Sequence, residues 1–184
     1  MSTIGFDTSN YTTSTAWTDG KNDINVRQIL YVKDGERGIR QSDGVFQHMK
    51  LMPVMYEKLS EQIDFKDVKA IGVSTRPRCV EGSYMPVFLA GEGYAKVVAD
   101  TLSVPLYEFS HQDGHIMAGI YSSGSFELLE NDFISVHLSG GTTEILKSRY
   151  NGFNFDNEII GGSKDISAGQ FIDRVGVKMG LHFP

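Results

Sequence analysis

The segment His-Gln-Asp-Gly-His at residues 111–115 holds two histidines four positions apart. Residues i and i+4 share one face of an α-helix, so His111 and His115 would stand side by side. Two imidazoles at this spacing can share one divalent metal ion. The same spacing also occurs on ordinary polar helices, and a metal ion usually takes at least a third protein ligand. The two histidines could therefore be a metal-binding pair or part of an ordinary polar helix face.

Two short hairpins are candidates for phosphate binding. In residues 137–144, "HLSGGTTE", glycines let the backbone approach a ligand closely and turn N–H groups toward phosphate oxygens. In residues 5–14, "GFDTSNYTTS", Asp7 stands at the end of a strand, in the corresponding place. Each hairpin alone could be a plain turn, but two of them facing one another would form a nucleotide clamp.

Residues 161–176, "GGSKDISAGQFIDRVG", lead from a double glycine into a helix. We expect Asp165 in the opening turn of that helix, where a carboxylate is favourable to the helix dipole. Asp173 lies eight residues further along, on roughly the same face. It could reach a cleft between two lobes.

These candidates need a scaffold, and the hydrophobic pattern predicts one. Ser110 and Asp113 form a capping-box pattern, which predicts that a helix begins at His111. Pro86 suits the first turn of the preceding helix. The predicted elements, in the order βββαβαβα, are strands at 2–9, 11–18 and 24–32, a helix at 44–59, a strand at 68–75, a helix from 86 to about 102, a strand at 104–109 and the helix from 111.

The order βββα then begins again, with strands at 132–139, 142–150 and 153–160 and a helix from about 165 to 179. We therefore expect an α/β protein with a ribonuclease-H-like fold of the actin/Hsp70 type (ASKHA). The first lobe, residues 1–122, would be complete. The second, residues 123–184, would be a partial lobe that ends before its remaining βαβα elements.

Composition narrows the class of function. Of the 184 residues, 40% are hydrophobic, the formal net charge is −6, and the pI is near 5.3. Broad, unaided nucleic-acid binding is not expected, because it needs clustered lysine and arginine. The sequence suggests neither a secretory signal nor a membrane span, and it holds a single cysteine, Cys79, more readily a loop residue than a nucleophile. We expect a cytoplasmic protein.

The motifs "HQDGH", "LSGGTTE" and "SAGQFIDRVGVKMGLHFP", in this order and spacing, resemble the TsaD family. This family is also called the O-sialoglycoprotein endopeptidase, Gcp-like or glycoprotease M22 family, and belongs to the actin-like ATPase superfamily. The resemblance implies a tRNA-modifying acyltransferase. It would move a threonylcarbamoyl group from threonylcarbamoyl-AMP to the adenosine beside the anticodon.

The resemblance also implies roles for individual residues. His111 and His115 would be ligands of one metal ion, iron or zinc, which would act as a Lewis acid. Asp7 would be a catalytic residue in the first phosphate hairpin. The residues implied to line the site for substrate and nucleotide, ATP, ADP or threonylcarbamoyl-AMP, are His137, Leu138, Ser139, Gly140, Gly141 and Asp173.

The chain departs from the family pattern at several places. It has Asn-Tyr-Thr-Thr at 10–13 where acidic residues are usual, Arg-Pro-Arg at 76–78 in place of a Gly-Pro-Gly-like turn, and Thr142 in place of a histidine. The family's third metal ligand, an aspartate, and its nucleoside-contacting asparagine belong to a segment expected after Pro184.

Two other functions compete with the transferase. One is a non-catalytic TsaB-like scaffold within the tRNA threonylcarbamoylation complex. Both main interpretations imply TsaB-like and TsaE-like partners, tRNA reached through the complex, no membrane, and a dimer or hetero-complex. The other is a metalloprotease, which is disfavoured because Gln112 stands where a zinc protease places its glutamate.

Overall fold

The computed structural model describes residues 1–33, 36 and 38–181. By internal contacts the chain divides into two compact units. Unit 1 comprises Met1–Tyr31 and Gly38–His111, and unit 2 comprises Val32–Arg37 and Gln112–Pro184. The predicted lobe boundary after residue 122 falls inside a helix, and it stays a proposal for how the lobes divide.

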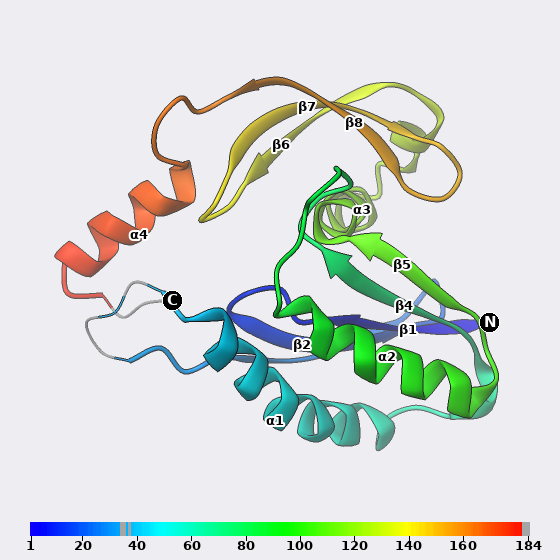
Figure 1. The fold of residues 1–184 in the computed structure, drawn as a ribbon. Coiled ribbons are helices and arrows are strands. Elements are labelled where there is room, and N and C mark those ends of the chain that lie inside the picture. Colours follow the sequence, from blue (N-terminus) through cyan, green and yellow to red (C-terminus); the bar gives the residue numbers. More distant parts are fainter. Residues whose placement is uncertain (34–35, 37, 182–184) are drawn as a thin grey trace. The chain divides into compact units, whose positions relative to one another are not determined.

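Unit 1 is built on a five-stranded mixed sheet with the strand order β3-β2-β1-β4-β5 (Figure 1). The first three strands form an antiparallel meander, and β4 and β5 add to the β1 edge in parallel. The strands are β1 (Ser2–Asp7), β2 (Thr12–Thr18), β3 (Asp23–Ile29), β4 (Val68–Arg76) and β5 (Leu106–Ser110). The parallel strands end at the same edge as β1, so their last residues lie close together.

Two helices pack on one face of this sheet: α1 (Gln41–Ser60) lies against β2 and β3, and α2 (Phe88–Leu102) lies against β4 and β1 (Figure 1). A single 3-10 turn, η1 (Phe65–Asp67), leads into β4. The core between these layers consists of residues that are at most 3% exposed: Ile4, Phe6, Met52, Leu59, Val68, Ile71, Val73, Ala95 and Ala99.

Pro53 lies inside α1 without ending it. Proline has no N–H, so the carbonyl four residues earlier, that of Met49, loses its helical donor. The Tyr94 hydroxyl on α2 donates to the Met49 carbonyl at 3.0 Å. The orphaned acceptor is thus satisfied from the neighbouring helix, which also ties α1 to α2.

Unit 2 holds a three-stranded antiparallel sheet in the order β6-β7-β8. Its elements are α3 (His111–Ser123), whose first residue belongs to unit 1, the 3-10 helix η2 (Phe126–Glu130), β6 (Phe133–Leu138), β7 (Thr143–Tyr150), β8 (Phe155–Gly162) and α4 (Ala168–Lys178). Ile116 and Ile120 of α3 pack with Leu146 and Phe155 of the sheet to form a separate small core.

The predicted order βββαβαβα followed by βββα is confirmed, and α3 begins at His111 as predicted. Two details of the prediction are wrong. Pro86 precedes α2 by two residues rather than lying in its first turn. Asp165 is not in the opening turn of α4, because Ser167 is the N-cap, and its side chain accepts from the Gln170 N–H.

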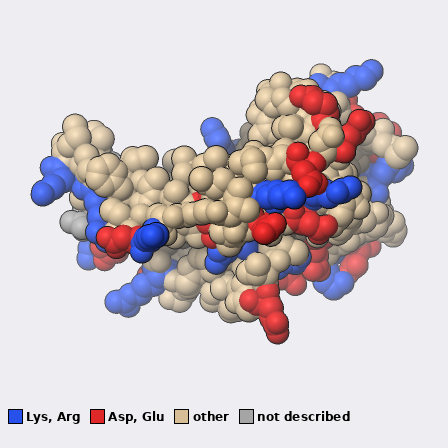
Figure 2. Space-filling model, turned by 90° about the horizontal axis from the view of Figure 1, so that it is seen from above, with Lys and Arg blue, Asp and Glu red and all other residues tan. Residues whose placement is uncertain are grey.

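The outer surface carries charges of both signs. Figure 2 shows lysine and arginine side chains interleaved with aspartate and glutamate on the face that it displays. On β7, Lys147 and Arg149 both pair with Asp132, at 3.0 and 3.4 Å. Within the part of the chain that the structure describes, no helix is long and apolar enough to cross a membrane.

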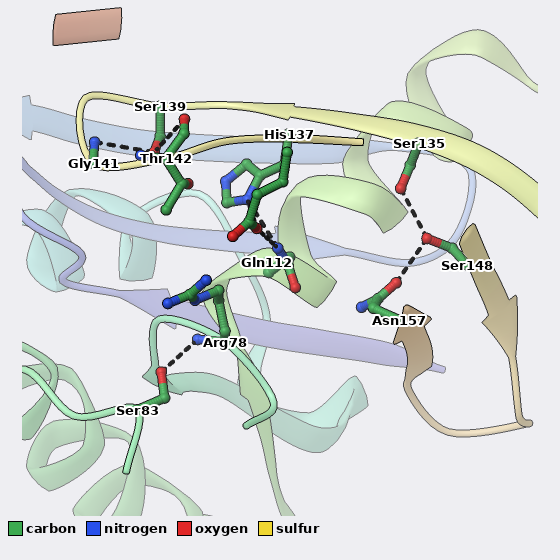
Figure 3. Close-up of polar contacts among 11 residues, drawn as sticks. Arg78, Ser83, Gln112, Ser135, His137, Ser139, Gly141, Thr142, Ser148 and Asn157 are labelled. Carbon is green, nitrogen blue, oxygen red and sulfur yellow. Dashed lines mark hydrogen bonds and ion pairs between the residues drawn. The ribbon is translucent and has the colours of Figure 1, made fainter. Parts of the chain in front are cut away.

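Cys79, the chain's one cysteine, is exposed in the loop that follows β4. The guanidinium of Arg76 donates to the Cys79 sulfur at 3.8 Å. In the same loop the Arg78 N–H donates to Ser83 Oγ at 2.9 Å (Figure 3). The Arg-Pro-Arg segment therefore forms a half-buried bend at the end of β4, held in part by side-chain contacts.

Candidate functional site

In unit 1 the strand register brings Asp7 and His111 together across 104 positions of sequence. Phe6 pairs with Val73 in the parallel ladder between β1 and β4, so Asp7 comes next to Ser74. In the neighbouring ladder, Ser74 pairs with Phe109 of β5, two residues before His111. His111 Nδ1 lies 2.8 Å from Asp7 Oδ2.

The Asp7 carboxylate is held in its charged form. Burial raises the pKa of Asp7, but the hydrogen bond from His111 and the charge of that ring when it is protonated, with smaller contributions from Ser9 and Ser74, outweigh it and lower the pKa to about 2. The Ser9 N–H donates to Oδ1 at 2.7 Å, while His111 contacts Oδ2. Both oxygens of Asp7 thus have partners within unit 1.

The hairpin after Asp7 is anchored on both sides. Thr8 is fully buried, and its hydroxyl donates to the Val87 carbonyl at 2.8 Å and accepts from the Gly91 N–H at 3.0 Å. A side chain at position 91 would meet Thr8, because an added Cβ would lie 2.9 Å from its Oγ1. The hairpin is therefore seated directly on the first turn of α2.

Unit 2 holds a second polar cluster, around His137 on the inner face of β6. The Gln112 amide donates to His137 Nδ1 at 2.9 Å and to Glu144 Oε2 at 3.3 Å (Figure 3). His137 faces Glu144 directly across the ladder between β6 and β7. The rings of His115 and His137 have centroids 5.7 Å apart. Four polar side chains thus meet beneath the sheet.

This cluster borders a cavity of about 220 Å³ between α3 and β6. The polar part of its lining consists of Gln112, His115, His137, Ser123 and Ser135. The rest is mainly apolar and includes Ile116, Ile120 and Phe133. Such a mixture of an apolar wall with a few convergent polar groups is typical of small-molecule sites.

The hairpin between β6 and β7 has the predicted Ser139-Gly140-Gly141 sequence, and its own serine organises it. Ser139 Oγ accepts from the N–H groups of Gly141, at 3.2 Å, and Thr142, at 2.9 Å (Figure 3). Ser139 N–H also closes the turn onto the Thr142 carbonyl. Two backbone amides therefore converge on one oxygen atom, the hydroxyl of Ser139 itself.

The same hairpin is packed against the start of α4. Ser167 Oγ donates to the Gly140 carbonyl at 2.8 Å, and the Ala168 N–H donates to Thr143 Oγ1 at 2.7 Å. Gly169 allows this approach, because a Cβ there would lie 2.4 Å from the Ser139 carbonyl oxygen. Asp173 lies nearby, its Oδ2 3.7 Å from the position of a Cβ on Gly140.

The predicted site residues thus form two groups, one in each unit. Asp7 and His111 meet in unit 1, while His115, His137, the glycine hairpin and Asp173 lie in unit 2. Leu138 does not join them: its side chain is on the opposite face of β6 from His137 and is 61% exposed. The roles predicted for these residues stay predictions.

The metal interpretation rests on the donor set of α3. His111 and His115 stand one turn apart at its start, and imidazole suits zinc and iron. Among the described residues, no group of three histidine, cysteine, aspartate or glutamate side chains could hold an ion. The two imidazoles fit as part of a ligand set.

Sequence reasoning missed Gln112, Glu144, Ser167 and Gly169. Ser167 could have been found, because Ser167-Ala-Gly-Gln170 is a capping-box pattern. Gln112 and Glu144 lie within the quoted motifs, but their meeting depends on the packing of α3 against β6 and β7. No local pattern marks the role of Gly169, which only the contact with Ser139 reveals.

Comparison with known proteins gives one family. A family model described as "TsaD: tRNA N6-adenosine threonylcarbamoyltransferase" matches residues 35–184. A protein of that name from Christiangramia forsetii is 32% identical over 136 residues, which are 73% of this chain and 37% of the relative. A relative of the same name from Pyrobaculum calidifontis is 27% identical over 184 residues, 98% of this chain and 50% of the relative. The chain thus spans half or less of these relatives.

Solved structures agree on the fold. YeaZ from Pseudomonas aeruginosa matches with a TM-score of 0.51 at 11% identity, covering 89% of this chain and 66% of that one. The ethanolamine utilization protein EutJ from Carboxydothermus hydrogenoformans matches with a TM-score of 0.51 at 16% identity, covering 100% of this chain and 58% of that one. The predicted α/β fold of the actin/Hsp70 type is confirmed.

Proposed function

Since the chain belongs to the TsaD family of tRNA N6-adenosine threonylcarbamoyltransferases, we propose that it takes part in transferring a threonylcarbamoyl group to tRNA. The donor would be threonylcarbamoyl-AMP, and the acceptor would be N6 of the adenosine beside the anticodon. The bond between the carbamoyl carbon and the phosphate oxygen breaks, a bond from N6 to that carbon forms, AMP leaves, and N6 loses one proton.

The observation that carries this proposal is the histidine pair at the start of α3, directly after the parallel strand β5. His111 and His115 would hold one divalent ion, iron or zinc. When bound, that ion supplies a Lewis acid for carbamoyl or phosphate oxygens.

Unit 2 would bind the nucleotide part of the donor. The Ser139-Gly140-Gly141 hairpin would approach the phosphate through its backbone, with the Gly141 N–H exchanging Ser139 Oγ for a phosphate oxygen, and Asp173 beside Gly140 would accept a hydrogen bond from a hydroxyl of the substrate. The Gln112 amide orients the His137 ring at the wall of the cavity. The family's ATP or ADP would use the same hairpin.

We place the protein in the cytoplasm, in a dimer or hetero-complex with TsaB-like and TsaE-like proteins. The net charge of −6 means that the tRNA contact would depend on those partners. The competing proposal is a non-catalytic TsaB-like scaffold. It differs in one clear expectation, because a scaffold needs no metal at the histidine pair.

Metal uptake tests the proposal. We expect the purified protein to bind Zn²⁺ or Fe²⁺ and the His111→Ala and His115→Ala variants to bind it at least 100-fold more weakly, since each removes one of two imidazole ligands. Titration calorimetry would measure the affinity. Activity would be measured by mass spectrometry, as the threonylcarbamoyladenosine formed from threonylcarbamoyl-AMP and tRNA with the partner proteins present.

The matched control is His137→Gln, which removes an imidazole outside the pair. It should keep the metal affinity of the unmodified protein and weaken nucleotide binding instead. Two results together would favour the scaffold. The protein would bind neither ion, and the complex would be equally active with the unmodified protein and with the His111→Ala variant.

A further inference from the structure

Asp7, the last residue of β1, uses its carboxylate for contacts within the protein, and one of these contacts is with a histidine. Asp7 was predicted as a catalytic residue of a phosphate hairpin, yet its Oδ2 contacts His111 Nδ1 at 2.8 Å and its Oδ1 accepts from the Ser9 N–H. A charged carboxylate in that position would repel a phosphate group. The contacts of Asp7 are instead those of a residue that orients a neighbouring side chain.

The carboxylate sits on a rigid base. Asp7 is the last residue of β1, paired with Ser14 of β2, and Thr8 beside it is fully buried and bonded at both its donor and its acceptor. Phe88 of α2 also packs against His111, with ring centroids 6.2 Å apart. The ring thus contacts both a fixed carboxylate and an aromatic side chain.

The contact also determines where the ring carries its proton. A carboxylate accepts a hydrogen bond, so His111 donates through Nδ1–H, and the neutral ring then has its lone pair on Nε2. Only a nitrogen with a lone pair can bind a metal ion. Carboxylate groups that hold the far nitrogen of a histidine in this way commonly orient metal ligands.

We propose that Asp7 is a positioning residue, which orients the His111 imidazole and fixes its tautomer so that Nε2 carries the lone pair that a metal ion would use. The inference rests on the proposed function only for the presence of that metal. In this role Asp7 does not contact the reacting atoms and acts only through His111.

Two measurements test the proposal. On the metal-free protein at pH 8.5, long-range ¹H–¹⁵N correlation spectra should show the Nδ1–H tautomer of His111, and Asp7→Ala should shift it toward the Nε2–H form. With Co²⁺ alone as the probe, Asp7→Ala should bind about 10- to 100-fold more weakly. Asp7→Asn, which keeps the shape and one acceptor oxygen, should fall between.

The controls separate positioning from folding. Asp19→Asn changes another aspartate with a pKa of about 2, lowered by its hydrogen bonds to Asn22 and Lys21 in an exposed turn, and should leave Co²⁺ affinity unchanged. In a His111→Ala background, Asp7→Ala should have no further effect on Co²⁺ affinity.

The outcomes also separate this inference from the proposed function. An Nε2–H tautomer in the unmodified protein, or Co²⁺ affinity within twofold after both Asp7 substitutions, overturns the positioning role. If the unmodified protein binds no Co²⁺, the proposed metal site fails. The tautomer spectra of the metal-free protein then still decide whether Asp7 orients the ring.

Discussion

Replacing Gly169 by alanine is expected to lower the free energy of unfolding by about 2–3 kcal/mol, the cost of overpacking a closed contact. The new Cβ would lie 2.4 Å from the carbonyl oxygen of Ser139, 2.5 Å from its carbon and 2.7 Å from the Gly140 nitrogen. All three are backbone atoms, which cannot turn aside as a side chain can. The hairpin must move away from α4, and nucleotide binding should weaken with it.

Urea unfolding measures the stability, and amide exchange of Gly141 and Thr142 reports on the hairpin itself. Gly176→Ala is the matched control, because it makes the same substitution in the same helix with nothing closer than 3.8 Å. It should stabilise α4 by about 0.5–1 kcal/mol, since alanine is the better helix former. Equal effects of the two substitutions would refute the packing argument.

The second large effect concerns His48, which is fully buried on α1. Its Nδ1 lies 2.7 Å from Thr13 Oγ1 and its Nε2 lies 3.1 Å from the Asn10 carbonyl. Asn10 has a φ of +52°, so one imidazole supports both a strand and a left-handed turn residue. His48→Leu should cost about 2–4 kcal/mol, because the buried Thr13 hydroxyl and the partly buried Asn10 carbonyl lose their partner.

Met52→Leu is the control for this substitution. Met52 is also fully buried, one turn further along α1, and the exchange conserves volume, so it should cost less than about 1.5 kcal/mol. Chemical unfolding at pH 8 would compare the two variants. A loss for His48→Leu no larger than that for Met52→Leu would contradict the role of the two hydrogen bonds.

His48 also predicts how stability depends on pH. Burial lowers the pKa of His48 below its ordinary value of 6.5, although the Asn10 carbonyl and the charge of Asp7 oppose this. The unfolded chain then binds a proton more readily than the folded one, so stability falls as the pH drops below about 6.5. Unfolding free energies between pH 8 and pH 5 should show this fall, and His48→Leu should lack this part of it.

The secondary structure was largely predictable because each element carries its own local signal. The helix expected at 44–59 is found at Gln41–Ser60, since its apolar residues recur on one face and Tyr94 compensates for Pro53. The helix after 165 begins later than predicted, because Asp165 and Ser167 both resemble caps and it is Ser167 that accepts from the Gln170 N–H. Local sequence could not choose between them.

The site was predictable in its residue types but not in its contacts. The spacing of His111 and His115 follows from helix geometry alone. The partner of His111 does not, because Asp7 reaches it only through the parallel register of β1, β4 and β5. The meeting of Gln112 with His137 and Glu144 likewise depends on how α3 packs on β6 and β7.

The exposed Cys79 gives the protein one addressable thiol, and no other has to be removed. A maleimide dye or nitroxide would therefore react at a single position in unit 1. Adding Ser122→Cys, at an exposed position of α3 in unit 2, would create a pair for pulsed dipolar spectroscopy. The distance distribution between the two labels would report whether nucleotide or metal changes the separation of the units.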